Sequence, residues 1–137
     1  MSDSLLVTGA AGQFGQRVLH FLVKSLSVPA TRIIATTRKP ESLSMWSDLG
    51  VTVRAADFED PASLTDAFRG AERLLLISTD ATDQPGRRLR QHTNAVEAAV
   101  RAGVSHVVYT SMPAPAGSPL LLAPDHEGTE AALASSA

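Results

Sequence analysis

The sequence predicts an α/β protein, an open and doubly wound parallel sheet of five strands in three layers, with helices on both faces. Two observations predict it. Short apolar stretches alternate with segments of helical periodicity, as in parallel strands joined by right-handed crossovers. In addition, Leu74-Leu75-Leu76-Ile77 is apolar throughout, as a strand covered on both faces requires. We expect strand order 3-2-1-4-5 and a ligand crevice between strands one and four at their carboxyl ends.

Each element has a local signal. Strands are marked by apolar or β-branched runs such as Ile33-Ile34-Ala35-Thr36-Thr37, and helices by apolar residues that recur on one face. Pro29 and Gly50 mark helix ends. Asp60 and Pro61 mark a helix start, as a capping carboxylate followed by a first-turn proline. In chain order, we expect strand 4–8, helix 13–26, strand 33–37, helix 43–49, strand 51–53, helix 61–69, strand 73–78, helix 87–102, strand 104–109 and helix 126–135.

The composition changes after Ser111. Four of the eight prolines fall within twelve residues, which predicts a loop, and Asp125 is expected to cap the last helix. No sixth strand follows, so we expect residues 1–137 to be one domain, the N-terminal part of a longer protein without its C-terminal strands and substrate subdomain. If the missing elements cover Val107 and Val108, apolar surface is exposed and a homo-oligomer is an expected consequence.

The composition suits one domain with a core of its own. The chain has 137 residues, of which 44% are hydrophobic, and a formal net charge of −2. This balance gives no electrostatic signature of nucleic-acid binding, and no apolar run approaches the ~20 residues of a membrane span. Without cysteine, disulfides, thiolate catalysis and zinc–thiolate sites are excluded. We therefore expect a cytoplasmic protein that binds neither nucleic acid nor membrane and holds no metal.

A glycine-rich turn follows the first predicted strand and opens the first predicted helix. Gly9 allows a sharp turn, Gly12 removes a side chain where a pyrophosphate approaches, and Gly15 lets the helix pack closely. The free N–H groups and the positive end of that helix then face the anion. This context predicts a Rossmann-type dinucleotide site rather than the alternative, an ordinary strand-to-helix turn. The expected cofactor contacts in this turn are Gly9, Ala10, Ala11, Gly12, Gln13, Phe14 and Gly15.

An arginine follows the second predicted strand. NAD-preferring sites usually place Asp or Glu about 20 residues after the glycines, where the carboxylate binds the ribose 2′-hydroxyl. Thr36-Thr37-Arg38-Lys39 contains no acid, and the guanidinium of Arg38 matches a 2′-phosphate. With Thr37 adding a hydroxyl, we predict that the site prefers NADP(H) to NAD(H). The alternative is that Arg38 and Lys39 form a solvated basic turn.

Further candidates follow the third and fourth strands. Asp57 is expected to accept from the exocyclic amine of adenine, and Phe58 to cover the base; the alternative is a turn-capping Asp57 and a core Phe58. Ile77, Ser78 and Thr79 would border the pyrophosphate and the nicotinamide ribose. Hydroxyl side chains also end many strands, so this signal is the weaker one.

The longest predicted helix carries several polar residues that we do not assign to catalysis. Arg87, Arg88 and Arg90 lie near its start, where the helix dipole disfavours cations. We expect a solvated basic face there, with a partner surface as the alternative. His92 and Asn94 are interpreted as packing or surface residues. The periodicity of this helix predicts an inward face made of Leu89, His92, Ala95, Val96, Ala99 and Val100.

These residues resemble the NmrA-like branch of the short-chain dehydrogenase superfamily, and most closely its NADPH-dependent quinone oxidoreductases. The resemblance implies that Gly9 to Phe14 wrap the pyrophosphate, that Arg38 takes the 2′-phosphate, and that hydride passes to a quinone or similar small acceptor. It extends over essentially the whole chain. The segments that carry it are 7–15, Arg38, 56–58, 74–78, 109–111, 118–120, 125–127 and Glu130.

The sequence departs from the superfamily at one motif. Where most members have Tyr-x-x-x-Lys, in which the lysine lowers the pKa of the proton-donating tyrosine, this chain reads His126-Glu127-Gly128-Thr129-Glu130. A quinone tolerates the loss, because its reduced oxygens take protons from solvent. A non-catalytic NADP(H) sensor or regulator of the NmrA type is the alternative function. His126 is a weak candidate for a catalytic acid, and a structural role is the alternative.

Overall fold

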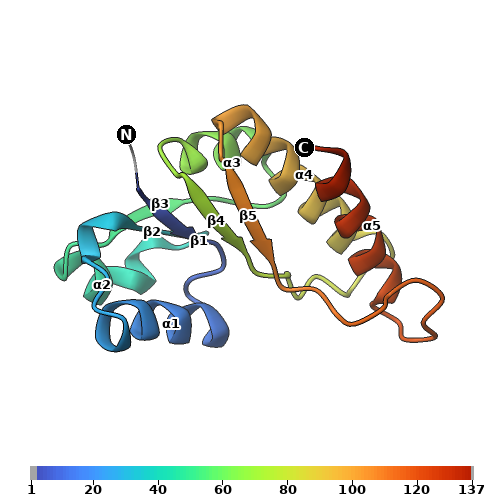
Figure 1. Ribbon diagram of the computed structural model, residues 1–137, viewed down its shortest axis with the longest axis horizontal. Coiled ribbons are helices and arrows are strands. Elements are labelled where there is room, and N and C mark those ends of the chain that lie inside the picture. The colour runs from blue at the N-terminus through green and yellow to red at the C-terminus, as the bar shows by residue number, and fades with distance from the viewer. Residues whose placement is uncertain (1–2, 137) are drawn as a thin grey trace.

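The computed structural model describes residues 3–136 and contains one five-stranded parallel sheet in the order β3-β2-β1-β4-β5. Helices lie on both faces of the sheet (Figure 1). The predicted fold class and strand order are therefore confirmed. The strands are β1 (Leu5–Val7), β2 (Ile33–Thr37), β3 (Thr52–Ala55), β4 (Arg73–Leu76) and β5 (His106–Tyr109).

The helices occupy the predicted places, with changes at two of their ends. They are α1 (Gln13–His20), α2 (Ser44–Asp48), α3 (Pro61–Phe68), α4 (Arg87–Ala102) and α5 (Ala123–Ser135). The expected helix 13–26 is α-helical only to His20 and continues as a π-helical turn over Phe21–Ser25. Helix α5 begins at Ala123 rather than after a cap at Asp125. The prediction of a loop through Pro124 was wrong, because proline is tolerated in the first turn of a helix, where its missing N–H has no partner to lose.

Two apolar clusters cover the two faces of the sheet. On one face, Leu19 of α1 and Trp46 of α2 pack with Val7 and Ile33 of the strands. On the other face, α3 and α4 pack over β1, β2 and β4 around the fully buried Phe68, and α5 adds half-buried side chains. Alternate side chains of β1 point into opposite clusters, as the pleat of a strand requires. Because both faces of the sheet are apolar, helices cover each of them, which gives three layers.

Helix α4 packs with most of the expected face, shifted toward two polar residues. Val100, predicted to point inward, is 56% exposed, while Gln91 and Arg88, which are polar, are buried. His92 and Ala95 lie in the core as predicted. The core face is therefore rotated toward polar residues, which need hydrogen-bond partners inside the fold.

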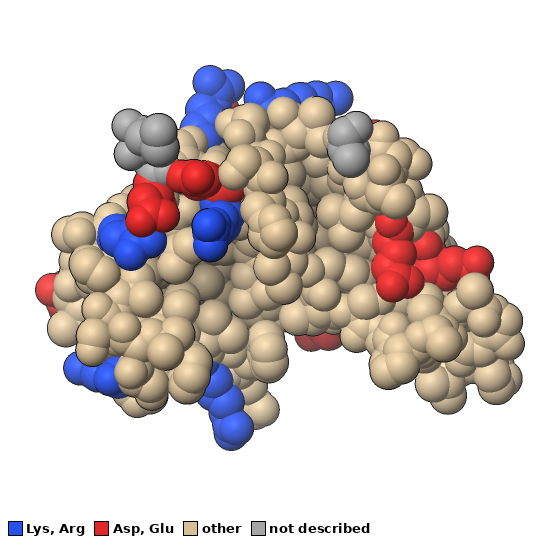
Figure 2. Space-filling view, in the orientation of Figure 1, with Lys and Arg blue, Asp and Glu red and all other residues tan. Residues whose placement is uncertain are grey.

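The surface carries charges of both signs in small separate groups on the face shown in Figure 2. Val108 on β5 is 53% exposed, as expected from the sequence, whereas Val107 is partly buried against the core. Within residues 3–136, no helix combines the length and the apolar character needed to cross a bilayer.

Replacing Gly15 by alanine tests the contact between α1 and the turn after β1. An added Cβ at Gly15 would collide with the Gly9 carbonyl oxygen and lie 2.7 Å from the Ala10 Cα. Overpacking against rigid backbone should lower the free energy of unfolding by about 1–3 kcal/mol or more. Gly12→Ala is the matched control, since its Cβ would stand 3.4 Å from the same oxygen and should cost less than about 1 kcal/mol. Urea unfolding measures both, and equal losses would contradict the close contact.

Candidate functional site

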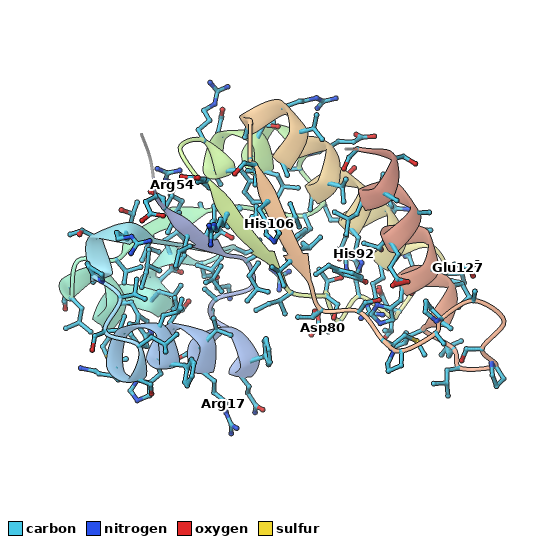
Figure 3. All side chains as sticks on the ribbon, viewed as in Figure 1. Arg17, Arg54, Asp80, His92, His106 and Glu127 are labelled. Atoms are coloured by element: carbon cyan, nitrogen blue, oxygen red, sulfur yellow. The ribbon has the colours of Figure 1, made fainter. Side chains whose placement is uncertain are left out.

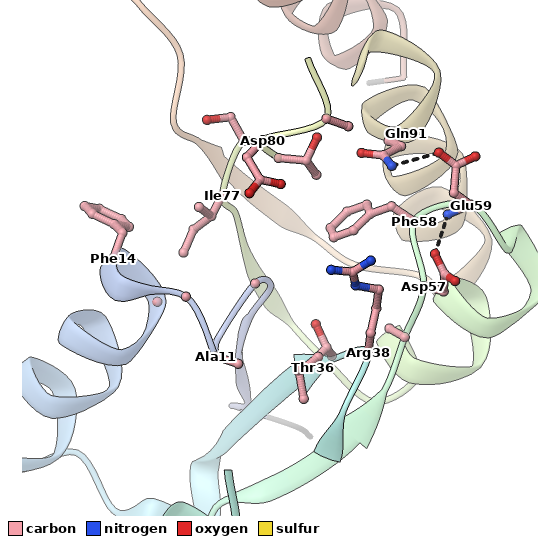
Figure 4. Close-up of a pocket in the computed structure, with 18 of the residues that line it drawn as sticks. Ala11, Phe14, Thr36, Arg38, Asp57, Phe58, Glu59, Ile77, Asp80 and Gln91 are labelled. Carbon is pink, nitrogen blue, oxygen red and sulfur yellow. Dashed lines mark hydrogen bonds between the residues drawn. The ribbon is translucent and has the colours of Figure 1, made fainter. Parts of the chain in front are cut away.

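A cleft of about 710 Å³ opens at the carboxyl edge of the sheet, where the chain leaves β1 and β4 toward helices on opposite faces (Figure 4). It gathers segments that are far apart in the sequence: the turn after β1, the ends of β2, β3 and β4, and the start of α4. Such a switch point is where open α/β sheets bind their ligands. The lining residues are Gly9, Ala11, Gly12, Gln13, Phe14, Gly15, Thr36, Thr37, Arg38, Ala56, Asp57, Phe58, Glu59, Ile77, Ser78, Thr79, Asp80, Ala81, Thr82, Asp83, Arg87 and Gln91.

The glycine turn has the geometry of an anion site. Gly9 has a φ of 58°, in the left-handed region that favours glycine, and its carbonyl accepts from the Gly12 N–H at 3.1 Å. Gly12 is the N-cap residue of α1, and no side-chain hydrogen bond caps that helix end. The first-turn residues therefore present backbone N–H groups at the cleft wall. Ala10 differs from its predicted partners, because it is fully buried, donates its N–H to Thr36 O at 3.1 Å and does not line the cleft.

Thr8 joins the chain at the ends of β1 and β4, and sequence reasoning did not assign it a role. Its buried hydroxyl donates to Leu75 O at 3.1 Å and accepts from the Ile77 N–H at 3.0 Å. Its own N–H also donates to Leu75 O at 3.1 Å. The pairing of β1 with β4 thus continues past the ends of both strands and fixes the floor of the cleft. In the sequence, the feature that could have indicated this role is the threonine directly before the first glycine of the turn.

Arg38 and its neighbours form the wall at the end of β2. The Arg38 side chain extends into the cleft beside the Phe58 ring (Figure 4). In the part of the chain that the structure describes, no carboxylate forms an ion pair with Arg38. Thr37 lines the cleft as well, and its hydroxyl accepts from the Lys39 N–H at 3.3 Å. The arrangement leaves a guanidinium available for an anion.

Asp57 and Phe58 line the cleft and also serve the structure. One Asp57 carboxylate oxygen accepts from the Glu59 N–H at 2.9 Å, which is the turn interaction considered as the alternative from the sequence. Phe58 packs partly against the core of α3 and α4, and its carbonyl accepts from Asn94 Nδ2 at 2.9 Å. Both residues therefore keep one surface in the cleft while the other is fixed by the fold.

The three residues after β4 also line the cleft, and hydrogen bonds on the side away from the cleft fix their positions. The Ser78 N–H donates to Thr110 Oγ1 at 2.7 Å. Thr79 is fixed on both sides, because its N–H donates to His92 Nε2 at 3.0 Å and its carbonyl accepts from Arg88 Nε at 2.5 Å. Ile77 is held through Thr8, as described above. The sequence placed Ile77, Ser78 and Thr79 at this wall, and the structure brings all three to it.

The opposite wall is an ion-pair network that the sequence did not reveal. Glu59 accepts from Arg87 Nε at 2.9 Å and from Gln91 Nε2 at 2.8 Å, and Arg87 Nη1 also contacts Asp83 at 2.8 Å. Chiefly the Arg87 hydrogen bond, together with that from Gln91, holds the pKa of Glu59 below its ordinary value. The prediction of a solvated basic face was therefore wrong for Arg87, which is paired, and for Arg88, which is only 5% exposed.

A buried polar cluster connects this wall to α5 (Figure 3 shows His92 between the sheet and that helix). Because the Thr79 N–H donates to His92 Nε2, a neutral imidazole carries its proton on Nδ1, which donates to Thr129 Oγ1 at 3.0 Å. Burial, with smaller contributions from Arg88 and His126, lowers the pKa of His92 to about 4. The neutral ring is therefore the form that supports Thr79.

His126, the weak catalytic candidate, lies in this cluster and not in the cleft lining. It is 6% exposed and stands 2.6 Å from the Tyr109 hydroxyl through Nδ1. Burial and the Arg88 guanidinium lower the pKa of His126, while Asp125 and Glu130 oppose that shift. These contacts show a structural role, and the catalytic role stays a prediction.

This is a dinucleotide-binding type of domain, as defined by the fold, the cleft at the switch point and the glycine turn together. The family model that matches residues 1–119 is that of the NmrA-like family. The chain belongs to the NmrA-like family.

Individual relatives agree with this assignment. The chain is 44% identical over 132 residues to quinone oxidoreductase 2 of Escherichia coli (strain K12), a match that spans 96% of this chain and 44% of the relative. The crystal structure of a Citrobacter sp. triphenylmethane reductase complexed with NADP(H) aligns with a TM-score of 0.91 and 41% identity over 97% of this chain and 46% of that one. An E. coli NADPH-dependent quinone oxidoreductase complexed with NADPH aligns with a TM-score of 0.88 and 44% identity over 96% and 45%. The chain thus spans less than half the length of these relatives.

The buried His92 makes stability depend on pH. In the unfolded chain the imidazole regains its ordinary pKa of 6.5, against about 4 in the folded state. The unfolded state therefore binds the extra proton between these values, so stability is complete above about pH 6.5 and falls as the pH drops toward 4. Between about pH 7 and about pH 5, the free energy of unfolding should fall by about 2 kcal/mol on account of this group.

His92→Gln is the matched variant, since an amide can still accept from Thr79 and donate to Thr129 without titrating. Urea unfolding at the two pH values should show a smaller loss in the variant than in the natural chain. His126 titrates in the same direction and remains in both proteins. An unchanged pH dependence would contradict the lowered pKa of His92.

Proposed function

We propose that the protein is an NADPH-dependent oxidoreductase that transfers hydride to a quinone or a similar small acceptor. The observation that carries the proposal is the cleft itself: an uncapped glycine turn faces an arginine at the end of β2, where a NAD-selective site would have an acid. The relatives support it, since the E. coli relative is a quinone oxidoreductase and two solved relatives are complexed with NADP(H) or NADPH.

The lining residues fit such a cofactor. The turn from Gly9 to Phe14 would receive the pyrophosphate on backbone N–H groups, and Arg38 with Thr37 would receive the 2′-phosphate. Asp57 and Phe58 would border the adenine. The hydroxyl-bearing wall of Ser78 and Thr79, together with Ile77, would border the nicotinamide ribose. When bound, the nicotinamide supplies the hydride, and the protein supplies binding and orientation.

The acceptor is argued from proton supply. Reduction of a quinone to a hydroquinone takes one hydride from the cofactor and one proton, and the hydroquinone oxygens exchange protons with water. Standard carbonyl reduction needs a positioned acid. The Tyr-x-x-x-Lys pair is replaced here, and His126 with Tyr109 lies hydrogen-bonded away from the cleft lining. Reduction of a quinone-like acceptor therefore requires no positioned acid from these side chains.

The second candidate is a non-catalytic protein that reports the NADP(H) redox state to a partner. The same replacement of the tyrosine and lysine favours it, and it uses the same cleft. Comparable affinity for oxidised and reduced cofactor, together with no turnover, would favour this sensor. Steady oxidation of NADPH by an acceptor would instead select the enzyme.

The preference for NADPH tests the role of Arg38. Because the guanidinium pairs with the 2′-phosphate, NADPH should bind at least ~10-fold more tightly than NADH. Arg38→Ala should remove most of that difference, whereas the control Lys39→Ala, at an exposed neighbour outside the cleft lining, should retain it. Titration calorimetry measures the affinities of the three proteins for both cofactors. Equal binding of NADPH and NADH by the natural chain would exclude this role of Arg38.

Turnover tests the enzyme itself. NADPH oxidation should proceed with members of a quinone panel and should be lost in Gly12→Val, because a branched side chain there occupies the approach to the turn. A circular dichroism melt of the variant separates lost binding from lost folding. A folded natural protein that binds NADPH and leaves every quinone of a broad panel unreduced would refute the oxidoreductase proposal and favour the sensor.

A further inference from the structure

Gln91 presents an oriented and unsatisfied acceptor on the wall of the cleft. The residue is 7% exposed and belongs to the cleft lining. Its Nε2 donates to Glu59 Oε1 at 2.8 Å, and its Oε1 is buried without a hydrogen-bond partner among the described residues. A carboxylate only accepts hydrogen bonds, so the nitrogen must face Glu59 and the oxygen must face the other way. In Figure 4 this oxygen points toward the space between Phe58 and Asp80.

The orientation is held by the surrounding network. Arg87 binds the same Glu59 oxygen at 2.9 Å and is itself held by Asp83 at 2.8 Å. One turn along α4 from Gln91, Asn94 donates to Phe58 O at 2.9 Å. Gln91 and Phe58 are therefore fixed relative to one another. A buried acceptor without a donor costs stability, which a ligand donor at this position would restore.

We propose that Gln91 Oε1 accepts a hydrogen bond from the exocyclic amine of adenine and makes the cleft selective for adenine dinucleotides over 6-oxopurine dinucleotides. This inference rests on the proposed binding of NADP(H). The phosphate contacts at Arg38 place the adenosine end beside Phe58, and Gln91 lies on the adjoining wall of the same cleft. A 6-oxopurine has a carbonyl in place of the amine, and two acceptors would then face each other.

The assignment is compatible with the expected contact at Asp57. The adenine amine carries two hydrogens, and only one oxygen of the Asp57 carboxylate is engaged by the Glu59 N–H. Because Gln91 Oε1 is enclosed, the amine reaches it only when a neighbouring side chain moves aside. Asp83 is 58% exposed, and its movement leaves the contacts of Arg87 and Gln91 with Glu59 in place.

The test compares NADPH with its hypoxanthine analogue, in which oxygen replaces the exocyclic amine. The natural chain should bind the analogue about three- to tenfold more weakly, the range expected for one hydrogen bond. Gln91→Leu removes the acceptor and should weaken NADPH by a similar factor while leaving the analogue nearly unchanged, so that the two ligands bind about equally. Titration calorimetry gives the four affinities, and a circular dichroism melt verifies that the variant is folded.

Gln84→Leu is the matched control, because it makes the same change at an exposed position outside the cleft lining. It should bind NADPH within about twofold of the natural chain. A preference for NADPH that survives in folded Gln91→Leu would overturn the inference and leave the proposed function intact. If Gln91→Leu fails to fold, equal binding of the two ligands by the natural chain still overturns the inference. Binding of neither dinucleotide by the folded natural chain would overturn both.

Discussion

The contact of Gly15 with the Gly9 carbonyl is the constraint on which the site depends. Helix α1 approaches the turn after β1 so closely that no side chain fits between them. That approach directs the first turn of α1 toward the carboxyl ends of β1 and β4, and Thr8 links the same two strands at the floor of the cleft. The glycine spacing in the sequence thus reflects how closely the backbone of α1 approaches the turn after β1.

The other wall of the cleft depends on α4, which supports two segments through polar side chains. His92 and Arg88 hold Thr79, Asn94 holds Phe58, and Gln91 holds Glu59. Thr79 follows β4, and Phe58 and Glu59 follow β3, so one helix sets the relative positions of these two segments. Because each tie is a hydrogen bond with little exposure to water, moving α4 would move the whole wall.

The sequence was sufficient for the features that have local causes. Strand order, the glycine turn and the residues after β2, β3 and β4 follow from periodicity and from the edge at which parallel strands end. The α4 wall was missed because an arginine or glutamine on an amphipathic helix usually faces solvent. Arg88 and Gln91 are buried only because partners distant in the sequence, Thr79 O and Glu59, stand opposite them. The start of α5 was missed because Pro124 suits both a loop and a first helical turn.

The same network bears on the chemistry that the cleft supports. The polar groups at the carboxyl end of β5 are engaged with one another: Tyr109 with His126, and Thr110 with Ser78. Burial raises the pKa of Tyr109 and lowers the pKa of His126, which disfavours the charged form of each group. A reaction whose protons come from water places no demand on them. On this ground we propose a quinone-like acceptor rather than a simple carbonyl, and the proposal rests on the contacts of α4 and α5 with Tyr109 of β5.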